Sequence, residues 1–212
     1  MNPGPRLWDI SPPVDSGTPV FPGDTPYAQE WTLTIGPGCP VNVGRVTLSP
    51  HVGAHADAPL HFDPAGAAIG VLDLAPFLGP CRVIHVIGAP FVTVAHVAPH
   101  AERLEARVLV RSYACRPRDR FDPDLPAFDP AALEWLADRG VRLVGTDSAS
   151  VDPASSKTLD AHQVLHRRDL RVLEGLCLDA IPEGLYELIA LPLRLTGADA
   201  SPVRAVLREV AP

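Results

Sequence analysis

Alternating and continuous apolar segments along the chain predict a mainly β fold with few helices. Residues 28–35 and 42–49 alternate apolar and polar side chains, as half-buried strands do. Short segments rich in branched residues predict further strands at 6–10, 82–87, 107–111, 141–145, 170–178, 186–191 and 203–209. A chain of 212 residues is long enough to bury a hydrophobic core without disulfides or structural metals. We expect one domain over residues 1–212.

Two segments carry the signals of a helix. Asp129 is suited to cap a helix over residues 129–140, and Gly140 is suited to close it in the left-handed conformation. A second helix is expected to begin near residue 158 or 160 and to end near residue 168. It would place His162 and His166 one turn apart on the same face.

Charge and composition narrow the possible partners. The net charge of −7 and the pI near 5.5 give no electrostatic footprint for a nucleic acid. The one basic cluster, Arg116–Arg120, is diluted by Pro117 and Asp119, and we predict that it is a solvated loop. The 25 prolines and 16 glycines are dispersed between apolar segments, which indicates loops. One of these loops, at 11–26, is expected to lie over a cleft.

The cysteines and apolar segments predict a cytoplasmic protein. Four cysteines, at positions 39, 81, 115 and 177, show no paired short spacing typical of a zinc knuckle or a redox motif. The first residues lack the apolar segment of a signal peptide, and no apolar segment approaches about 18 residues. A metal-free hydrolase is disfavoured, because the sequence contains neither a Gly-x-Ser-x-Gly motif nor a cysteine in a recognised nucleophile motif.

Residues 50–62 concentrate the chemistry of the chain. Three of the eight histidines and one carboxylate fall within eleven residues: His51, His55, Asp57 and His61. An extended chain would place all four on one face, but a straight strand would separate His51 from Asp57 by about 20 Å. Gly53 and the flanking prolines allow the chain to bend. We therefore predict a shaped loop at the end of a strand.

Imidazoles with one carboxylate suit a zinc ion, which takes nitrogen and oxygen ligands. Packing or capping is the alternative, and it is the preferred role for His85, His96 and His100. Glu174 lies in an otherwise apolar segment, where a metal partner would offset the cost of burying its carboxylate. Spacing alone does not choose between His162 and His166 as a further ligand. Asp147 and Ser148, at a strand end, are expected to form a turn or to support the site.

The segment His51-Val-Gly-Ala-His55-Ala-Asp57-Ala-Pro-Leu-His61 resembles the H-x-G-[TA]-H-x-D-x-P-x-H signature of the metal-dependent cyclase-like amidohydrolases. Within that family the chain is most similar to the bacterial kynurenine formamidases, on the further segments 7–13, 19–26, 156–162 and 174–176. Two positions depart from the pattern. Ala54 stands where many members have Thr, and Phe21 stands where the formamidases have Trp.

The resemblance implies an α/β fold of the swivelling β/β/α cyclase-like type and a homodimer or larger assembly. It implies two Zn²⁺ ions per subunit, one held by His51, His55, Asp57 and Glu174 and the other by Asp57, His162 and Glu174. His162 fits the family interval of twelve residues before Glu174, whereas His166 does not. By the same resemblance, His61 would transfer a proton and Phe21 would contact the substrate.

The implied reaction is hydrolysis of N-formyl-L-kynurenine to L-kynurenine and formate, in tryptophan degradation. Another amidohydrolase of the same family, acting on a cyclic amide such as isatin, is the nearest alternative. A non-catalytic protein with a closed metal site is a second alternative, and the number of candidate ligands and the intact His61 disfavour it.

Overall fold

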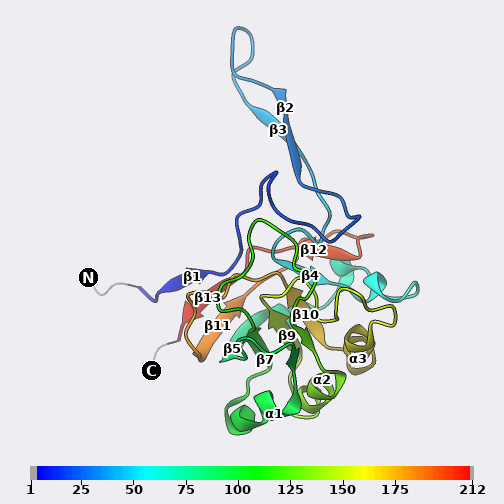
Figure 1. Ribbon diagram of the computed structural model, residues 1–212. Coiled ribbons are helices and arrows are strands. Elements are labelled where there is room, and N and C mark those ends of the chain that lie inside the picture. The colour runs from blue at the N-terminus through cyan, green and yellow to red at the C-terminus, as the bar shows by residue number, and fades with distance from the viewer. Residues whose placement is uncertain (1–3, 211–212) are drawn as a thin grey trace.

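The computed structural model describes residues 4–210, and one nine-stranded mixed sheet forms its centre (Figure 1). The strands follow the order β1-β13-β11-β5-β7-β9-β10-β4-β12 across the sheet. Their bounds are β1 Leu7–Asp9, β4 His55–Asp57, β5 Leu78–His85, β7 Arg107–Arg111, β9 Leu143–Thr146, β10 Arg171–Glu174, β11 Gly184–Ile189, β12 Ala200–Pro202 and β13 Val206–Glu209. This architecture confirms the mainly β fold with few helices.

The middle of the sheet is parallel and is covered on both faces. Strands β5, β7, β9 and β10 pair in parallel, whereas their outer neighbours pair antiparallel. Successive side chains of β7 alternate between two buried clusters: Val108 and Val110 belong to one, and Leu109 belongs to the other. Coverage on both faces explains why these strands are continuous apolar segments in the sequence.

Three α-helices are described: α1 (Val94–Val97), α2 (Pro130–Ala137) and α3 (Asp160–Arg168). Helices α2 and α3 pack beside each other below the sheet (Figure 1), and their apolar side chains join the cluster that contains Val108. The predicted cap is confirmed, since the Asp129 carboxylate accepts the Ala131 N–H at 2.9 Å. Gly140 has the left-handed conformation expected of it, with φ +83°.

Short elements complete the fold. A small parallel pair joins β6 (Phe91–Val92) to β8 (Ala127–Phe128). The 3₁₀ segments are η1 Pro59–His61, η2 Ile69–Val71, η3 Ala75–Phe77 and η4 Ala98–Arg103. None of the helices in residues 4–210 is long and apolar enough to cross a membrane.

Two strands form an arm that projects from the body: β2 (Ala28–Leu33) and β3 (Val43–Thr47) (Figure 1). In the described part of the chain they pair only with each other, and every residue of both strands is exposed. The prediction of half-buried strands at 28–35 and 42–49 was therefore correct in type and wrong in burial. Alternation shows that one face is apolar but does not show what covers that face.

The structure also corrects the prediction for the histidine segment. Residues 50–54 form the expected turn, but His55–Asp57 is a regular strand, β4, with antiparallel partners on both sides. The flanking prolines lie outside the three paired residues, so they do not interrupt the ladder. The strand predicted at 170–178 is also shorter than expected, because β10 ends at Glu174 and the chain turns at Gly175, which has φ +65°.

Candidate metal centre

Sheet register brings the first three polar side chains of the site together. His55 on β4 lies opposite Glu174 on β10. Asp57, two residues beyond His55, points to the same face of the sheet. Glu174 also ends a parallel strand, and the carboxyl ends of parallel strands are a frequent location of binding sites in such sheets. The site therefore lies at the carboxyl end of β10, beside β4.

Two glycines allow the chain segments around the site to approach closely. Gly53 has φ +70°, and Gly175 has φ +65°. A Cβ atom at position 175 would lie 2.2 Å from the Gly53 carbonyl oxygen, which is far inside van der Waals contact. The same carbonyl accepts a hydrogen bond from the His55 ring, with a distance of 2.9 Å to Nδ1. Glycine at 175 thus lets the turn after β10 lie against the turn that orients His55.

Five distances define the cluster of imidazoles and carboxylates. His55 Nε2 lies 3.4 Å from Asp57 Oδ1 and 3.4 Å from Glu174 Oε2. His162 Nε2, from α3, lies 3.5 Å from Asp57 Oδ2 and 3.7 Å from Glu174 Oε1. Each carboxylate therefore directs one oxygen toward His55 and the other toward His162. His51 Nδ1 lies 3.0 Å from Asp57 Oδ1, on the His55 side.

The arrangement of these atoms suits metal ligation better than hydrogen bonding among the side chains. Within residues 4–210, His55 Nε2, His162 Nε2 and both Asp57 oxygens are buried without a hydrogen-bond partner. Leaving such atoms without a partner costs free energy. Two ligands of one tetrahedral zinc ion, each at 2.0–2.2 Å, lie about 3.4 Å apart. The separations of 3.4 to 3.7 Å are close to this spacing, so cations bound among these atoms would satisfy all four orphaned positions.

The other ring nitrogen of each imidazole is already committed. His55 Nδ1 pairs with the Gly53 carbonyl, His162 Nδ1 lies 2.6 Å from Asp152 Oδ2, and His51 Nε2 lies 2.9 Å from Asp199 Oδ2. With these nitrogens donating, the nitrogens that face Asp57 are left as lone-pair acceptors. Such outer hydrogen bonds fix the tautomer and the orientation of metal-binding histidines.

The electrostatic field of the cluster favours positive charge. Burial lowers the pKa of His162, but its hydrogen bond to Asp152 and the nearby Asp57 outweigh burial and raise that pKa to about 10. Burial is likewise outweighed at His51, where Asp57 and Asp199 raise the pKa to about 9. Burial raises the pKa of Asp57, yet the facing histidines hold it well below its usual value. A dication would replace the protons that this field attracts.

His61 lies at the edge of the cluster. Its Nδ1 is 3.2 Å from Asp199 Oδ2, the same oxygen that pairs with His51, and its side chain is 33% exposed. Among residues 4–210, two groups of three residues have ligand atoms within 4.8 Å of one another: His51, Asp57 and His61, and His55, Asp57 and Glu174. His61 is thus near enough to be a ligand by distance alone, but its side chain is more exposed than that of His51, at 33% against 18%.

A cavity of about 450 Å³ opens beside the cluster and is lined by the predicted loop. Phe21, from residues 11–26, lines it and packs edge-on against Phe121 with ring centroids 5.0 Å apart. The prediction that Arg116–Arg120 is merely a solvated loop was wrong for Arg116, which is half-buried and lines the cavity. Burial raises the pKa of Asp147, also in this wall, to about 6.

The histidines that the sequence analysis did not assign as metal ligands, His166 and His85, lie outside the cluster. His166 is 41% exposed at its side chain and pairs with Asp63 at 3.3 Å. His85 Nε2 lies 2.9 Å from the Ile181 carbonyl oxygen, as expected for a packed histidine. Sequence reasoning missed Asp152 and Asp199, because neither stands in a local motif. Asp199 also lies 148 residues from His51, whereas Asp152 precedes His162 by only ten.

Comparison with known proteins agrees with this geometry. Residues 8–153 match the Cyclase family. A kynurenine formamidase of Delftia acidovorans is 65% identical over 207 residues, which cover 97% of this chain and 99% of that protein. The solved structure of a predicted metal-dependent hydrolase from Bacillus stearothermophilus has a TM-score of 0.83 at 28% identity, covering 98% of this chain and all of that one. An isatin hydrolase bound to thioisatinate shares the fold, with a TM-score of 0.82, 23% identity and coverage of 98% of this chain and 93% of that chain.

A buried set of imidazoles and carboxylates beside an open cavity, on this fold, defines a metal-dependent hydrolase. The chain belongs to the Cyclase family and, within it, to the kynurenine formamidases.

Proposed function

We propose that the chain hydrolyses N-formyl-L-kynurenine to L-kynurenine and formate, with Zn²⁺ as its metal and two ions per subunit. The observation that carries the metal count is the orientation of the two carboxylates, each of which directs one oxygen toward His55 and the other toward His162. His51, His55, Asp57 Oδ1 and Glu174 Oε2 would hold one ion, and His162, Asp57 Oδ2 and Glu174 Oε1 the other. The identity of 65% to a kynurenine formamidase supports the substrate.

Two zinc ions bound here would lower the pKa of a shared water and stabilise negative charge on the reacting oxygen. His61 supplies the proton transfers. With Nδ1 donating to Asp199, its Nε2 is free to take a proton from the attacking water. As the water oxygen bonds to the formyl carbon and the carbon–nitrogen bond breaks, His61 returns that proton to the departing arylamine nitrogen. The products are L-kynurenine and formate.

Phe21 is proposed to contact the aromatic ring of the substrate. It is 44% exposed, lines the cavity and stands edge-on to Phe121. An aryl ring placed beside this pair adds a further aromatic contact. The ring system of isatin would also fit such a wall, so an isatin-type hydrolase is the second candidate, and the shared fold of the isatin hydrolases supports it.

The substrate assignment is tested by a comparison of substrates. The purified holoenzyme is expected to hydrolyse N-formyl-L-kynurenine with a kcat/KM at least about tenfold above that for formanilide or isatin, since its amino-acid side chain can make further contacts that the smaller substrates lack. Product formation is followed by absorbance. Preference for isatin would leave the metal site intact and would contradict the proposed substrate.

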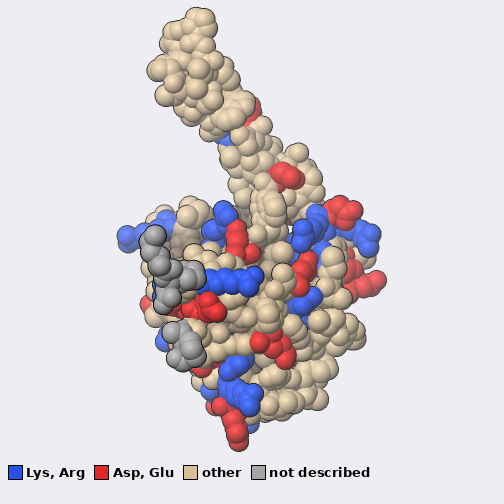
Figure 2. Space-filling view, turned by 90° about the vertical axis from the view of Figure 1, so that its left-hand side faces the viewer, with Lys and Arg blue, Asp and Glu red and all other residues tan. Residues whose placement is uncertain are grey.

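We also propose that the chain forms a homodimer through the β2–β3 arm. An isolated two-stranded hairpin is only marginally stable in water, so a projecting arm needs a covering surface. Residues 28–47 contain only two charged side chains, Glu30 and Arg45, and the outer part of the arm shows no charge in Figure 2. Its exposed apolar side chains are Trp31, Leu33, Ile35, Val41, Val43 and Val46.

The cytoplasmic location stays a prediction that the four free cysteines support.

The arm is expected to control assembly. In size-exclusion chromatography with light scattering, the wild-type protein should have twice the mass of one 22.6 kDa chain. Replacing Trp31 and Leu33 together by glutamate should yield the single-chain mass, because the charges oppose burial of the arm. Val71→Glu, at an exposed apolar residue of the body, is the matched control and should remain dimeric. A monomeric wild-type protein would contradict the proposal.

A further inference from the structure

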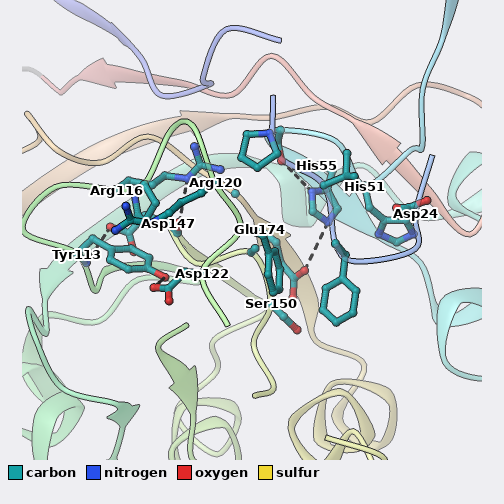
Figure 3. Close-up of a pocket in the computed structure, with 18 of the residues that line it drawn as sticks. Asp24, His51, His55, Tyr113, Arg116, Arg120, Asp122, Asp147, Ser150 and Glu174 are labelled. Carbon is teal, nitrogen blue, oxygen red and sulfur yellow. Dashed lines mark hydrogen bonds and ion pairs between the residues drawn. The ribbon is translucent and has the colours of Figure 1, made fainter. Parts of the chain in front are cut away.

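The cavity has two ends of different chemistry. Figure 3 shows His51 and His55 on one side of the view and Glu174 near its centre. The other side holds Tyr113, Arg116, Arg120 and Asp122. The second group comes from the loop that follows β7, within residues 112–126. A substrate whose reacting group lies at the imidazole end would therefore direct its opposite end toward this loop.

Arg116 is fixed in the wall of this second end. Its Nε donates to the backbone carbonyl of Asp147 at 3.2 Å, and its backbone N–H donates to Asp179 Oδ1 at 3.0 Å. The guanidinium makes no ion pair with any carboxylate of residues 4–210. Burial lowers the pKa of this group. Arg116 is thus a half-buried cation, anchored through one side-chain nitrogen. Its two terminal nitrogens have no hydrogen-bond partner among the described residues and are available to a ligand.

The nearest acidic side chains are committed elsewhere. Both oxygens of Asp147 accept backbone N–H groups, from Ser112 at 2.8 Å and Tyr113 at 3.2 Å. Asp179 uses one oxygen for the Arg116 backbone and the other for Arg118, at 3.2 Å. Neither carboxylate neutralises the Arg116 guanidinium directly. Because an unpaired charge in a partly buried wall is costly, the arrangement favours an anionic ligand.

Given the proposed function, we propose that Arg116 binds the α-carboxylate of the substrate. It would thereby select aryl formamides that carry an amino-acid group over aryl formamides that lack a carboxylate. N-Formyl-L-kynurenine carries its formamide at one end and an amino-acid group at the other, which matches the two ends of the cavity. The planar guanidinium fork donates two parallel hydrogen bonds to a carboxylate. Arg120 also lines the cavity but is exposed, so solvent screens its attraction for an anion more strongly.

The test compares two substrates in two variants. Arg116→Gln should raise KM for N-formyl-L-kynurenine by about 10- to 100-fold, the loss expected for a charge-assisted hydrogen bond. Its kcat/KM for N-formylkynuramine, which has the same aryl formamide but no carboxylate, should stay within about twofold. Arg118→Gln is the matched control, because Arg118 is exposed, pairs with Asp179 and does not line the cavity. It should leave both substrates unchanged.

Calorimetric binding of the products provides a readout that does not depend on turnover. L-Kynurenine should bind wild-type protein more tightly than kynuramine, and Arg116→Gln should remove this difference while Arg116→Lys restores part of it. If Arg116→Gln lowered kcat/KM equally for N-formyl-L-kynurenine and N-formylkynuramine, or lowered it for neither, the role of Arg116 would be overturned. If wild-type protein turned over formanilide or isatin but not N-formyl-L-kynurenine, the proposed function itself would fail, which is a distinct result.

Discussion

Replacing Asp57 by asparagine is expected to lower kcat for N-formyl-L-kynurenine by at least about 10³-fold and to lower the bound zinc below two ions per chain. Asp57 is buried, and its two oxygens face different imidazoles: Oδ1 lies 3.4 Å from His55 Nε2, and Oδ2 lies 3.5 Å from His162 Nε2. An amide of the same shape keeps one oxygen but carries no charge, and its nitrogen is not a ligand.

The matched control is Asp63→Asn, six residues along the same segment. Asp63 pairs with His166 at 3.3 Å, outside the cluster, so this variant should retain activity within about twofold and its full metal content. Metal content is measured by atomic emission after gel filtration, together with steady-state kinetics. Wild-type turnover in Asp57→Asn with two zinc ions bound would exclude Asp57 as a bridging ligand.

Replacing His61 by alanine is expected to lower kcat by about 10²- to 10⁴-fold, the usual contribution of a general acid and base. Zinc content should not change, since His61 is proposed to lie beside the metal ligands and not among them. Its ring stands 4.3 Å from the His51 ring, centroid to centroid, and shares the Asp199 oxygen with it. Proton transfer from water to the departing nitrogen would then lack its carrier.

The control for His61 is His166→Ala, which removes an exposed imidazole of helix α3 and should leave kcat within about twofold. Metal analysis separates the two possible roles of His61. If His61→Ala lost zinc in proportion to activity, His61 would be a ligand, as its distance to His51 and Asp57 allows. A His61→Ala variant with the normal zinc content and wild-type turnover would show that His61 does not transfer the proton.

Local patterns predicted most strands and the turn before His55, because both depend on residues close in sequence, but they did not predict that His55–Asp57 is a regular strand. Alternation of β7 side chains between two cores and the cap at Asp129 follow directly from periodicity and capping. Spacing could not separate His162 from His166, since both lie on one face of α3. Tertiary packing separates them: His162 is buried against Asp152, and His166 is exposed.

The remaining features depend on contacts between distant segments, which one sequence does not reveal. Asp199 reaches His51 across 148 residues, and the Arg116 side chain reaches the Asp147 backbone across 31. The alternation of β2 correctly predicted a strand but not that its apolar side chains remain exposed. A covering layer can come from the same chain or from another copy, and the pattern is identical in both cases.

The most direct test of the central claim is a zinc titration of the metal-stripped protein, with the rate of L-kynurenine release from N-formyl-L-kynurenine as the signal. We expect no turnover without metal and a rise in rate that reaches its plateau at two equivalents per chain. Full turnover without metal, a plateau at one equivalent, or tight binding of two zinc ions without turnover would contradict this claim.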